Sequence, residues 1–244
     1  GYKSYRAMSD WLVWIAEERM KIMLQSNPSL SGKVHDVGCA TGEFLQVAMK
    51  RGFQASGCDL SESIVQGCRE RGLEVYATTI HGLPYGASSF DAITFFDSLE
   101  HTLTPVRDIQ RTWELLKPGG MCVVSTPNSS SLEFRLQRKR WQGFYTSREH
   151  LFLFNPGVLR RFFCDNGFER ISHYTIAGDP ALTHIVSRLF RGQWIDMLRF
   201  PFSVRHSRSD IKNRIKIPYY FVAERLGWGH NLFTMAFKKE SRLL

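Results

Sequence analysis

The 244-residue sequence lacks the features that would place a chain outside the ordinary globular class. Its five cysteines are few, odd in number and never spaced as C-x-x-C, which argues against a disulfide framework and against a zinc ribbon. It has no run of about 18 apolar residues, so no transmembrane helix is predicted. The first ten residues are polar and do not form a signal-peptide pattern. We therefore expect a cytoplasmic protein with reduced thiols.

The composition also lacks the biases of disordered and fibrous chains. Hydrophobic residues make up 43% of the sequence and charged residues 23%, which excludes disorder, collagen and coiled coil as the main state. No internal repeat is present. At about 150 residues per domain, the length predicts one large domain or one domain with an insertion.

The charge is basic but unevenly distributed. The net charge is +9, and it lies in two stretches: residues 184–225 hold nine basic and three acidic side chains, and residues 133–149 hold five and two. The rest of the chain is balanced. An acidic partner is therefore expected at these stretches, and nucleic acid, an anionic substrate and a membrane surface are the three classes that fit.

The order of predicted elements is typical of an α/β protein. Apolar residues at helical spacing alternate with short apolar runs that are bounded by glycine, proline and polar residues. This alternation predicts a doubly wound sheet of about seven strands, mostly parallel, with helices on both faces. The predicted helices are residues 9–25, 42–51, 61–71, 105–116 and 156–166, and the strands are residues 33–38, 54–59, 73–79, 91–96, 121–126, 169–176 and 231–237.

A glycine turn after the first strand predicts a nucleotide-type site. Gly38 and Gly42 allow positive φ and a close approach of the backbone to a ligand, and a helix N-terminus follows them. Asp59 ends the next strand, 21 residues after Gly38, where a carboxylate can bind both ribose hydroxyls. Ala40 and Glu43 stand where a dinucleotide fingerprint has glycines, which argues against a pyrophosphate.

The same residues resemble those of class I S-adenosylmethionine-dependent methyltransferases. The resemblance is closest to the small-molecule branch that is similar to ubiquinone-biosynthesis O-methyltransferases. It rests on five signatures in register over residues 33–126, namely Asp36-Val-Gly-Cys-Ala-Thr-Gly42, Asp59-Leu-Ser, Leu83-Pro84 with Ser89-Phe-Asp91, Leu99-Glu-His101 and Leu116-Lys-Pro-Gly-Gly120. Similar patterns at residues 149–155, 166–168 and 231–233 extend it to most of the chain.

The resemblance implies a single Rossmann-like domain over residues 1–244 in which the last strand is antiparallel. Residues 1–30 would form an N-terminal helical segment, and residues 31–176 and 231–240 the core. Residues 178–230, rich in basic and aromatic side chains, would be a helical, lid-like insertion before the last strand.

The resemblance also implies S-adenosylmethionine as cofactor. Gly38 and its loop would hold the methionine portion, Asp59 the ribose, and Leu60 would pack on the adenine. Phe96 would lie near the sulfonium, and Ile80 follows Thr79, the position where an acidic residue often contacts the adenine amino group. The expected cofactor-binding residues are Asp36, Gly38, Cys39, Ala40, Thr41, Gly42, Asp59, Leu60, Ile80 and Phe96.

Two histidines in these motifs are candidate catalytic bases. A methyl group on a sulfonium needs an oriented nucleophile and a dry site, and a base helps when the acceptor is a hydroxyl. His101 and His150 are predicted to serve, while helix-start packing for His101 and a loop-fixing hydrogen bond for His150 remain alternatives. Asp97, Glu100 and His101, spaced i, i+3 and i+4, could also converge on a divalent cation, or could cap the next helix.

Two features of the sequence indicate the class of acceptor: motifs of base-methylating enzymes are absent, and basic residues are clustered. No Asn/Asp-Pro-Pro-aromatic motif follows the fourth strand and no Pro-Cys pair exists, which disfavours two routes of base methylation. Arg138, Arg140 and Trp141 are expected to bind the acceptor at the rim of the pocket. Our first hypothesis is O-methylation of a small, anionic acceptor, with peripheral membrane contact as a second role for the basic rim and solubility as the alternative. RNA methylation and a non-catalytic cofactor-binding protein with a docking surface are the other two hypotheses, and the oligomeric state is left open.

Overall fold

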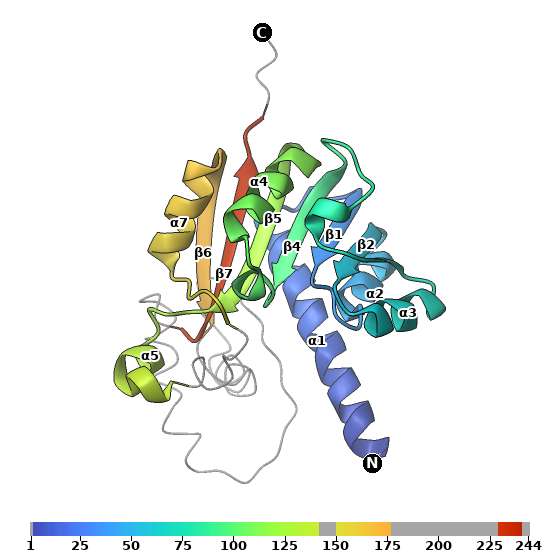
Figure 1. The fold of residues 1–244 in the computed structure, drawn as a ribbon, viewed down its shortest axis with the longest axis horizontal. Helices are drawn as coiled ribbons and strands as arrows, with labels where there is room; N and C mark the ends of the chain where they lie inside the picture. The colour runs from blue at the N-terminus through green and yellow to red at the C-terminus, as the bar shows by residue number, and fades with distance from the viewer. Residues whose placement is uncertain (1, 142–149, 177–228, 241–244) are drawn as a thin grey trace, which may run out of the picture.

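The computed structural model describes residues 2–141, 150–176 and 229–240 (Figure 1). The insertion expected at residues 178–230 therefore lies almost wholly outside the described residues. In chain order the elements are α1 (Tyr2–Ser26), β1 (Lys33–Val37), α2 (Glu43–Lys50), β2 (Gln54–Asp59), α3 (Glu62–Glu70), β3 (Glu74–Ala77), η1 (Ile80–Gly82), β4 (Phe90–Phe96), η2 (Leu99–His101), α4 (Pro105–Leu115), β5 (Leu116–Pro127), α5 (Leu132–Gln137), η3 (Arg138–Arg140), α7 (Pro156–Asp165), β6 (Phe168–Ile176) and β7 (Asn231–Lys238).

A seven-stranded sheet organises these elements, in the order β3-β2-β1-β4-β5-β7-β6. The first five of these strands pair in parallel, and β7 is antiparallel to both β5 and β6. The Rossmann-like sheet and its antiparallel last strand are therefore confirmed. The extent of the single domain, residues 1–244, remains a prediction.

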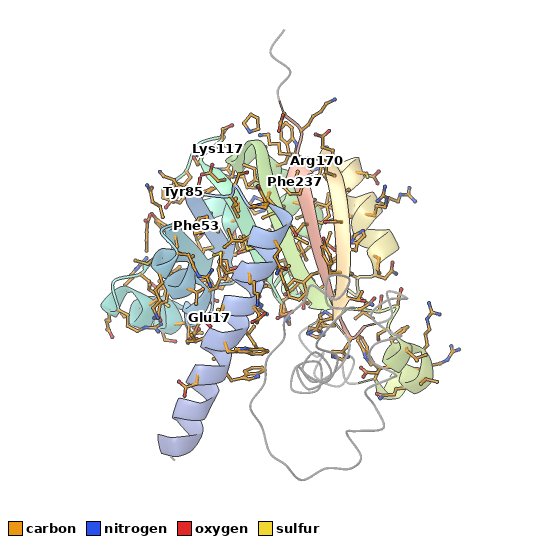
Figure 2. The ribbon with its side chains drawn as sticks, turned by 180° about the vertical axis from the view of Figure 1, so that it is seen from behind. Glu17, Phe53, Tyr85, Lys117, Arg170 and Phe237 are labelled. Atoms are coloured by element: carbon orange, nitrogen blue, oxygen red, sulfur yellow. The ribbon has the colours of Figure 1, made fainter. Side chains whose placement is uncertain are left out.

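Helices cover both faces of the sheet. One apolar cluster joins α1, α2 and α3 to one face, through residues such as Met20, Val47 and Val65. A second cluster joins α4 and α7 to the other face, through Ile109 and Phe163. Figure 2 shows α1 crossing the back of the sheet. Successive side chains along each buried strand point to opposite faces of the sheet and so enter one cluster or the other. Because helices cover both faces, the central strands are apolar on both.

Two element boundaries differ by five residues or more from those that the sequence predicts. Helix α1 begins at Tyr2 rather than at residue 9, because no proline or glycine interrupts residues 2–8. Strand β5 begins at Leu116 rather than at residue 121, and residues 117–120 bulge out of the ladder instead of forming a simple turn. Lys117 holds this bulge by bonding Asp91 at 2.8 and 2.9 Å.

The carboxyl ends of β1, β2 and β4 lie at one edge of the sheet, where parallel strands of doubly wound proteins bind ligands. The segment after β5, with α5, extends from the same edge, at the bottom of Figure 1. Within the described part of the chain, no helix combines the length and the apolar character needed to cross a membrane.

Candidate functional site

The turn between β1 and α2 forms a tight backbone loop. Gly38 has a φ of 75°, and an added Cβ would lie 2.6 Å from the Cβ of Ser98, which follows β4. The amides of Gly38 and Cys39 donate to the carbonyl of Cys58 at 2.8 and 3.0 Å. Gly42, with a φ of 77°, precedes α2. Glycine is therefore needed at position 38 for two reasons, the left-handed backbone and the contact with β4.

Asp59 ties this loop to the end of β2. Its two carboxylate oxygens accept hydrogen bonds from the amides of Ala40 at 3.1 Å and Ser61 at 2.9 Å. Each oxygen keeps a second lone pair, so the carboxylate is oriented and can still accept bonds from two ribose hydroxyls. Leu60 is 75% exposed beside it, where a flat adenine ring could cover the side chain. These two positions fit the predicted cofactor contacts.

Four other predicted cofactor residues differ in exposure. Ala40 has a φ of 43° and is exposed with Thr41, whose hydroxyl donates to Glu43 at 2.6 Å. Cys39 is buried, and burial raises its thiol pKa, so this thiol is not a nucleophile. Ile80 is buried beneath the surface of η1 and can support a ligand only from below.

Asp36 lies inside the protein rather than facing the loop. Burial raises the pKa of its carboxyl to about 7, and the hydroxyl of Thr94 donates to it at 2.6 Å. The side chain is 3% exposed. Asp36 therefore supports the end of β1 from within, and it would act on a cofactor through the backbone that it holds.

Arg19 of α1 is a functional candidate that the motifs did not reveal. Its guanidinium forms an ion pair with Asp97, and its Cζ lies 4.6 Å from the centroid of the Phe96 ring. Phe96 is buried and packs edge-on against Phe44 of α2, with ring centroids 4.8 Å apart. Arg19 thus places a cation at the end of β4, beside the turn at residues 38–42, which we call the cofactor loop. Only the helical pattern of α1 was visible in the sequence, not the strand that it crosses.

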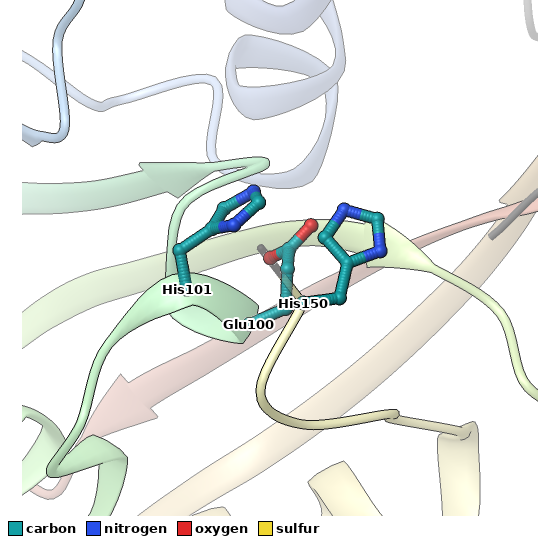
Figure 3. A group of neighbouring side chains, drawn as sticks. All are labelled: Glu100, His101 and His150. Carbon is teal, nitrogen blue, oxygen red and sulfur yellow. The ribbon is translucent and has the colours of Figure 1, made fainter. Parts of the chain in front are cut away.

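Glu100, His101 and His150 come together at the end of η2 (Figure 3). One ligand atom from each of the three side chains lies within 4.8 Å of the other two. The two imidazole rings have centroids 4.7 Å apart and planes tilted by 56°. In Figure 3 the carboxyl group of Glu100 lies between the two rings. The structure therefore brings both predicted catalytic histidines to one place.

The backbone of Glu100 holds this cluster together. Its carbonyl oxygen accepts hydrogen bonds from the amides of Leu151 at 2.8 Å and Phe152 at 3.2 Å, which brings the segment of His150 onto η2. The Glu100 side chain is 1% exposed. Burial, and after it the negative charge of Asp97, raises the pKa of its carboxyl to about 8. A neutral carboxyl is therefore available beside the two imidazoles at neutral pH.

The predicted triplet of Asp97, Glu100 and His101 does not form. Asp97 precedes η2 with a φ of 54°, and its carboxylate accepts a hydrogen bond from Ser125 at 3.0 Å and pairs with Arg19. The helical spacing assumed for the triplet fails because the helical turn begins only at Leu99. His150 instead joins Glu100 and His101 as the third residue of the cluster. It is about 50 residues further along the chain, so a spacing argument could not include it.

The predicted acceptor residues lie on a segment that we call the basic arm, residues 132–141. It contains α5, η3 and Trp141, and Arg138 and Lys139 are exposed on it. Trp141 is 0% exposed, so its side chain does not face solvent in this structure. Arg140 lies on η3, and its side chain is outside the described set.

Comparison with known proteins agrees with the fold. A family described as methyltransferase domain matches residues 15–173. A ubiquinone biosynthesis O-methyltransferase of Methylococcus capsulatus is 36% identical over 115 residues, which cover 44% of this chain and 48% of that protein. The chain thus matches about half the length of this curated relative.

Solved structures share the fold at low identity. A protein of Thermotoga maritima, described as an S-adenosylmethionine-dependent methyltransferase and possible histamine N-methyltransferase, superposes with a TM-score of 0.61 at 19% identity, covering 98% of this chain and 94% of that one. A phosphoethanolamine N-methyltransferase of Haemonchus contortus in complex with S-adenosyl-L-methionine gives 0.61 at 17% identity, covering 91% and 52%. The chain therefore belongs to the methyltransferase domain family, and S-adenosylmethionine is the cofactor that this family uses.

Proposed function

We propose that the protein transfers a methyl group from S-adenosylmethionine to an oxygen of a small, anionic acceptor. The observation that carries the proposal is the cluster of Glu100, His101 and His150, at the sheet edge that also holds the cofactor loop. Ser98, which would contact a Cβ on Gly38, lies only three residues before His101, so the two halves of the site adjoin.

The residues present fit the cofactor. Gly38 and its neighbours would hold the methionine portion by their backbone, Asp59 would accept bonds from the ribose hydroxyls, and Leu60 would cover the adenine. Arg19 would bind the methionine carboxylate, since its guanidinium lies over Phe96 at the end of β4. When bound, S-adenosylmethionine supplies a methyl group that is already activated for transfer.

The cluster would handle the proton of the acceptor. A hydroxyl becomes a better nucleophile as it loses its proton, and a base in position contributes about 100- to 10,000-fold to such a step. His101 or His150 would take the proton, while the other histidine and Glu100 hold the orientation of the ring. Glu100 is suited to this positioning role because it is buried and joined by its backbone to the segment of His150.

Charge and relatives support an anionic acceptor methylated at oxygen. Arg138 and Lys139 are exposed on the basic arm, and the sequence around them carries a net positive charge. A guanidinium binds carboxylate or phosphate in a fixed geometry. The relative from Methylococcus capsulatus is named as an O-methyltransferase of ubiquinone biosynthesis. A cytoplasmic setting is part of the proposal, and all five cysteines are unpaired in the structure.

The test separates chemistry from cofactor binding. His101→Gln and His150→Gln should each lower the methyl transfer rate to a phenolic acceptor, about 100-fold or more for the residue that serves as base. The affinity for S-adenosylhomocysteine, measured by calorimetry, should stay within about twofold, because neither ring is part of the cofactor loop. His173→Gln is the matched control, since His173 pairs with Thr234 at 2.9 Å between β6 and β7. Wild-type rates in both cluster variants would sink the base assignment.

A divalent cation is the second candidate role for the same cluster. Two imidazoles and one carboxylate whose ligand atoms lie within 4.8 Å of one another form a common donor set for a transition metal. Loss of transfer activity after chelation, restored by added Zn²⁺ or Mn²⁺, would favour the cation. Activity that survives exhaustive chelation would leave the cluster to proton transfer alone.

Two other hypotheses from the sequence have distinct outcomes. Methylation of RNA would show binding to RNA that falls steeply with salt concentration, because phosphate contacts release counterions. A non-catalytic protein would bind S-adenosylmethionine without transferring label to any component of a cell extract. Vesicles of anionic lipid test the membrane hypothesis for the basic arm, by co-sedimentation at low and high salt.

A further inference from the structure

His230 contacts both ends of the basic arm, residues 132–141. Near the start of the arm, its Nδ1 lies 2.6 Å from the Oε2 of Glu133. At the end of the arm, its ring lies 6.1 Å from the ring of Trp141, with the planes at 63°. A segment of ten residues is thus held at two points by one side chain that lies about 90 positions further along the chain.

The sheet holds His230 firmly. Its carbonyl oxygen accepts a hydrogen bond from the amide of Asn128 at 2.8 Å, and the side chain of Asn128 donates to the carbonyl of Gly229, also at 2.8 Å. The next residue, Asn231, begins β7 and pairs with both neighbouring strands. Asn128 itself is fully buried. His230 is therefore a fixed point from which the arm can be positioned.

The arm needs such a fixed point. Its exposed surface carries Arg135, Arg138 and Lys139, whose like charges repel one another. Arg138 also has a φ of 47°, a left-handed conformation that costs free energy for any residue other than glycine. Short helices such as α5, with six residues, are not stable alone. Contacts near its two ends therefore help to stabilise the arm.

Two contacts close the arm upon itself. The hydroxyl of Ser131 accepts the amide of Phe134 at 3.1 Å and caps α5. Phe134 meets Trp141 edge-on, with centroids 5.2 Å apart. The Trp141 side chain is fully buried. His230 completes the set, since it joins this closed arm to the sheet.

We propose that His230 is a positioning residue which, through Glu133 and Trp141, holds the cations of the basic arm where they bind the anionic group of the acceptor. The proposal rests on the proposed function for the identity of that acceptor. It adds a residue that lies outside the sequence motifs and joins the basic arm to the start of β7.

The first measurement follows the arm without using activity. Trypsin cleaves after lysine and arginine, so Arg135, Arg138 and Lys139 report directly on the order of the arm. In His230→Leu and Glu133→Ala, cleavage at these positions, located by mass spectrometry, should become at least about fivefold faster, because exposed sites are cut in proportion to local opening. His230→Asn and Glu133→Gln, which keep the donor and the acceptor, should restore the wild-type rate. His173→Gln is the control.

The second measurement follows the acceptor. The probes are 3,4-dihydroxybenzoate and 4-methylcatechol, which share the ring hydroxyls and differ in one carboxylate. In His230→Leu the KM for 3,4-dihydroxybenzoate should rise about tenfold, as expected when a charged group loses a hydrogen bond to its partner. The KM for 4-methylcatechol and both kcat values should stay within about twofold.

The outcomes separate the two proposals. Unchanged proteolysis of the arm in His230→Leu overturns the positioning role, whatever the activity. Faster proteolysis with equal rises in KM for both phenols overturns the link to the anionic group. If the wild-type enzyme methylates neither phenol, the choice of a phenolic oxygen is wrong, while the proteolysis still decides whether His230 holds the arm.

Discussion

At the scale of single residues, the cofactor loop depends on backbone conformations that side chains disfavour. Gly38, Ala40 and Gly42 all have positive φ within five positions. Glycine adopts this region freely, whereas the same conformation at an L-residue such as Ala40 costs about 1 to 2 kcal/mol of conformational free energy. A strained loop of this kind persists because Asp59 and Cys58 hold its amides.

Replacing Gly38 separates two reasons for glycine at this position, the contact with Ser98 and the strain of a positive φ. Gly38→Ala should lower the free energy of unfolding by about 2 to 4 kcal/mol, because it combines a left-handed alanine with a Cβ that meets Ser98. Gly52→Ala is the matched control, since Gly52 has a φ of 88° with no atom within 4 Å of an added Cβ. It should lose only about 1 kcal/mol. Urea denaturation measures both unfolding free energies. Equal losses in the two variants would mean that the contact with Ser98 contributes nothing.

At this scale, sequence reasoning can propose residues that are close along the chain or at a known spacing. Gly38 and Asp59 could be chosen because a loop and the end of the next strand meet at one sheet edge. Arg19 could not be chosen, since a basic residue on an amphipathic helix has no signature of its own. His101 and His150 were both candidates, but nothing in the sequence shows that Glu100 lies between them.

At the scale of elements, α1 brings the positive charge of Arg19 to the end of β4. The helix crosses the back of the sheet (Figure 2). Its Arg19 lies over Phe96, at the end of β4. The pairing of Arg19 with Asp97 shows that a carboxylate is accepted at this position. A second carboxylate, on the methionine portion of the cofactor, could therefore be bound by the same guanidinium.

Removing Arg19 should affect ligands according to their carboxylate. Arg19→Ala should weaken the binding of S-adenosylhomocysteine by about 1.5 to 3 kcal/mol, the range for a hydrogen bond to a charged group. The binding of 5′-methylthioadenosine, which has no carboxylate, should change little. Calorimetry on both ligands gives the comparison, with the exposed Glu17→Ala of the same helix as control. Equal losses for the two ligands would mean that Arg19 only supports the fold.

The start of β5 shows why element boundaries were less predictable than elements. The sequence at residues 117–120 contains proline and two glycines, which predicts a turn. In the structure Leu116 already pairs with Phe90, and the next four residues bulge outward before pairing resumes at Met121. The lysine of this segment binds Asp91, so a tertiary ion pair keeps the segment in the sheet.

At the scale of the whole molecule, stability should vary with pH through two buried neighbours on β1. Burial lowers the pKa of His35 from 6.5 to about 3, and burial raises the pKa of Asp36 from 3.8 to about 7. Between about pH 3 and 6.5, His35 is protonated in the unfolded chain and neutral in the folded chain, so stability falls as pH falls. Between about pH 4 and 7 the folded chain keeps a proton on Asp36, so stability falls as pH rises.

The two effects should appear as opposite slopes in variant comparisons. The difference in unfolding free energy between wild type and His35→Gln should increase with pH by up to about 1.4 kcal/mol per unit from pH 4.5 to 6.5, and then level off. The difference between wild type and Asp36→Asn should decrease with pH over the same range. Urea denaturation at four pH values measures both, and parallel curves for a variant and wild type would contradict the assignment of that residue.

The overall architecture was the part most open to prediction from sequence. Alternating strands and helices leave few topologies, because crossover connections in parallel sheets have one hand. The residues that we propose to complete the site from a distance, Arg19, His150 and His230, come from segments before β1 and after β5. Their positions depend on packing between parts of the chain that no local pattern relates.

The place of β7 in the sheet has a consequence for how the chain folds during synthesis. β7 lies between β5 and β6, so β6 has no neighbour in the described sheet until residues 231–238 have left the ribosome. The first five strands can pair as they emerge, but the last hairpin-like pairing must wait for the end of the core. Because His230 directly precedes β7, the basic arm would gain its fixed point in that same last step. A nascent chain would thus form its cofactor half early and its acceptor half only at the end.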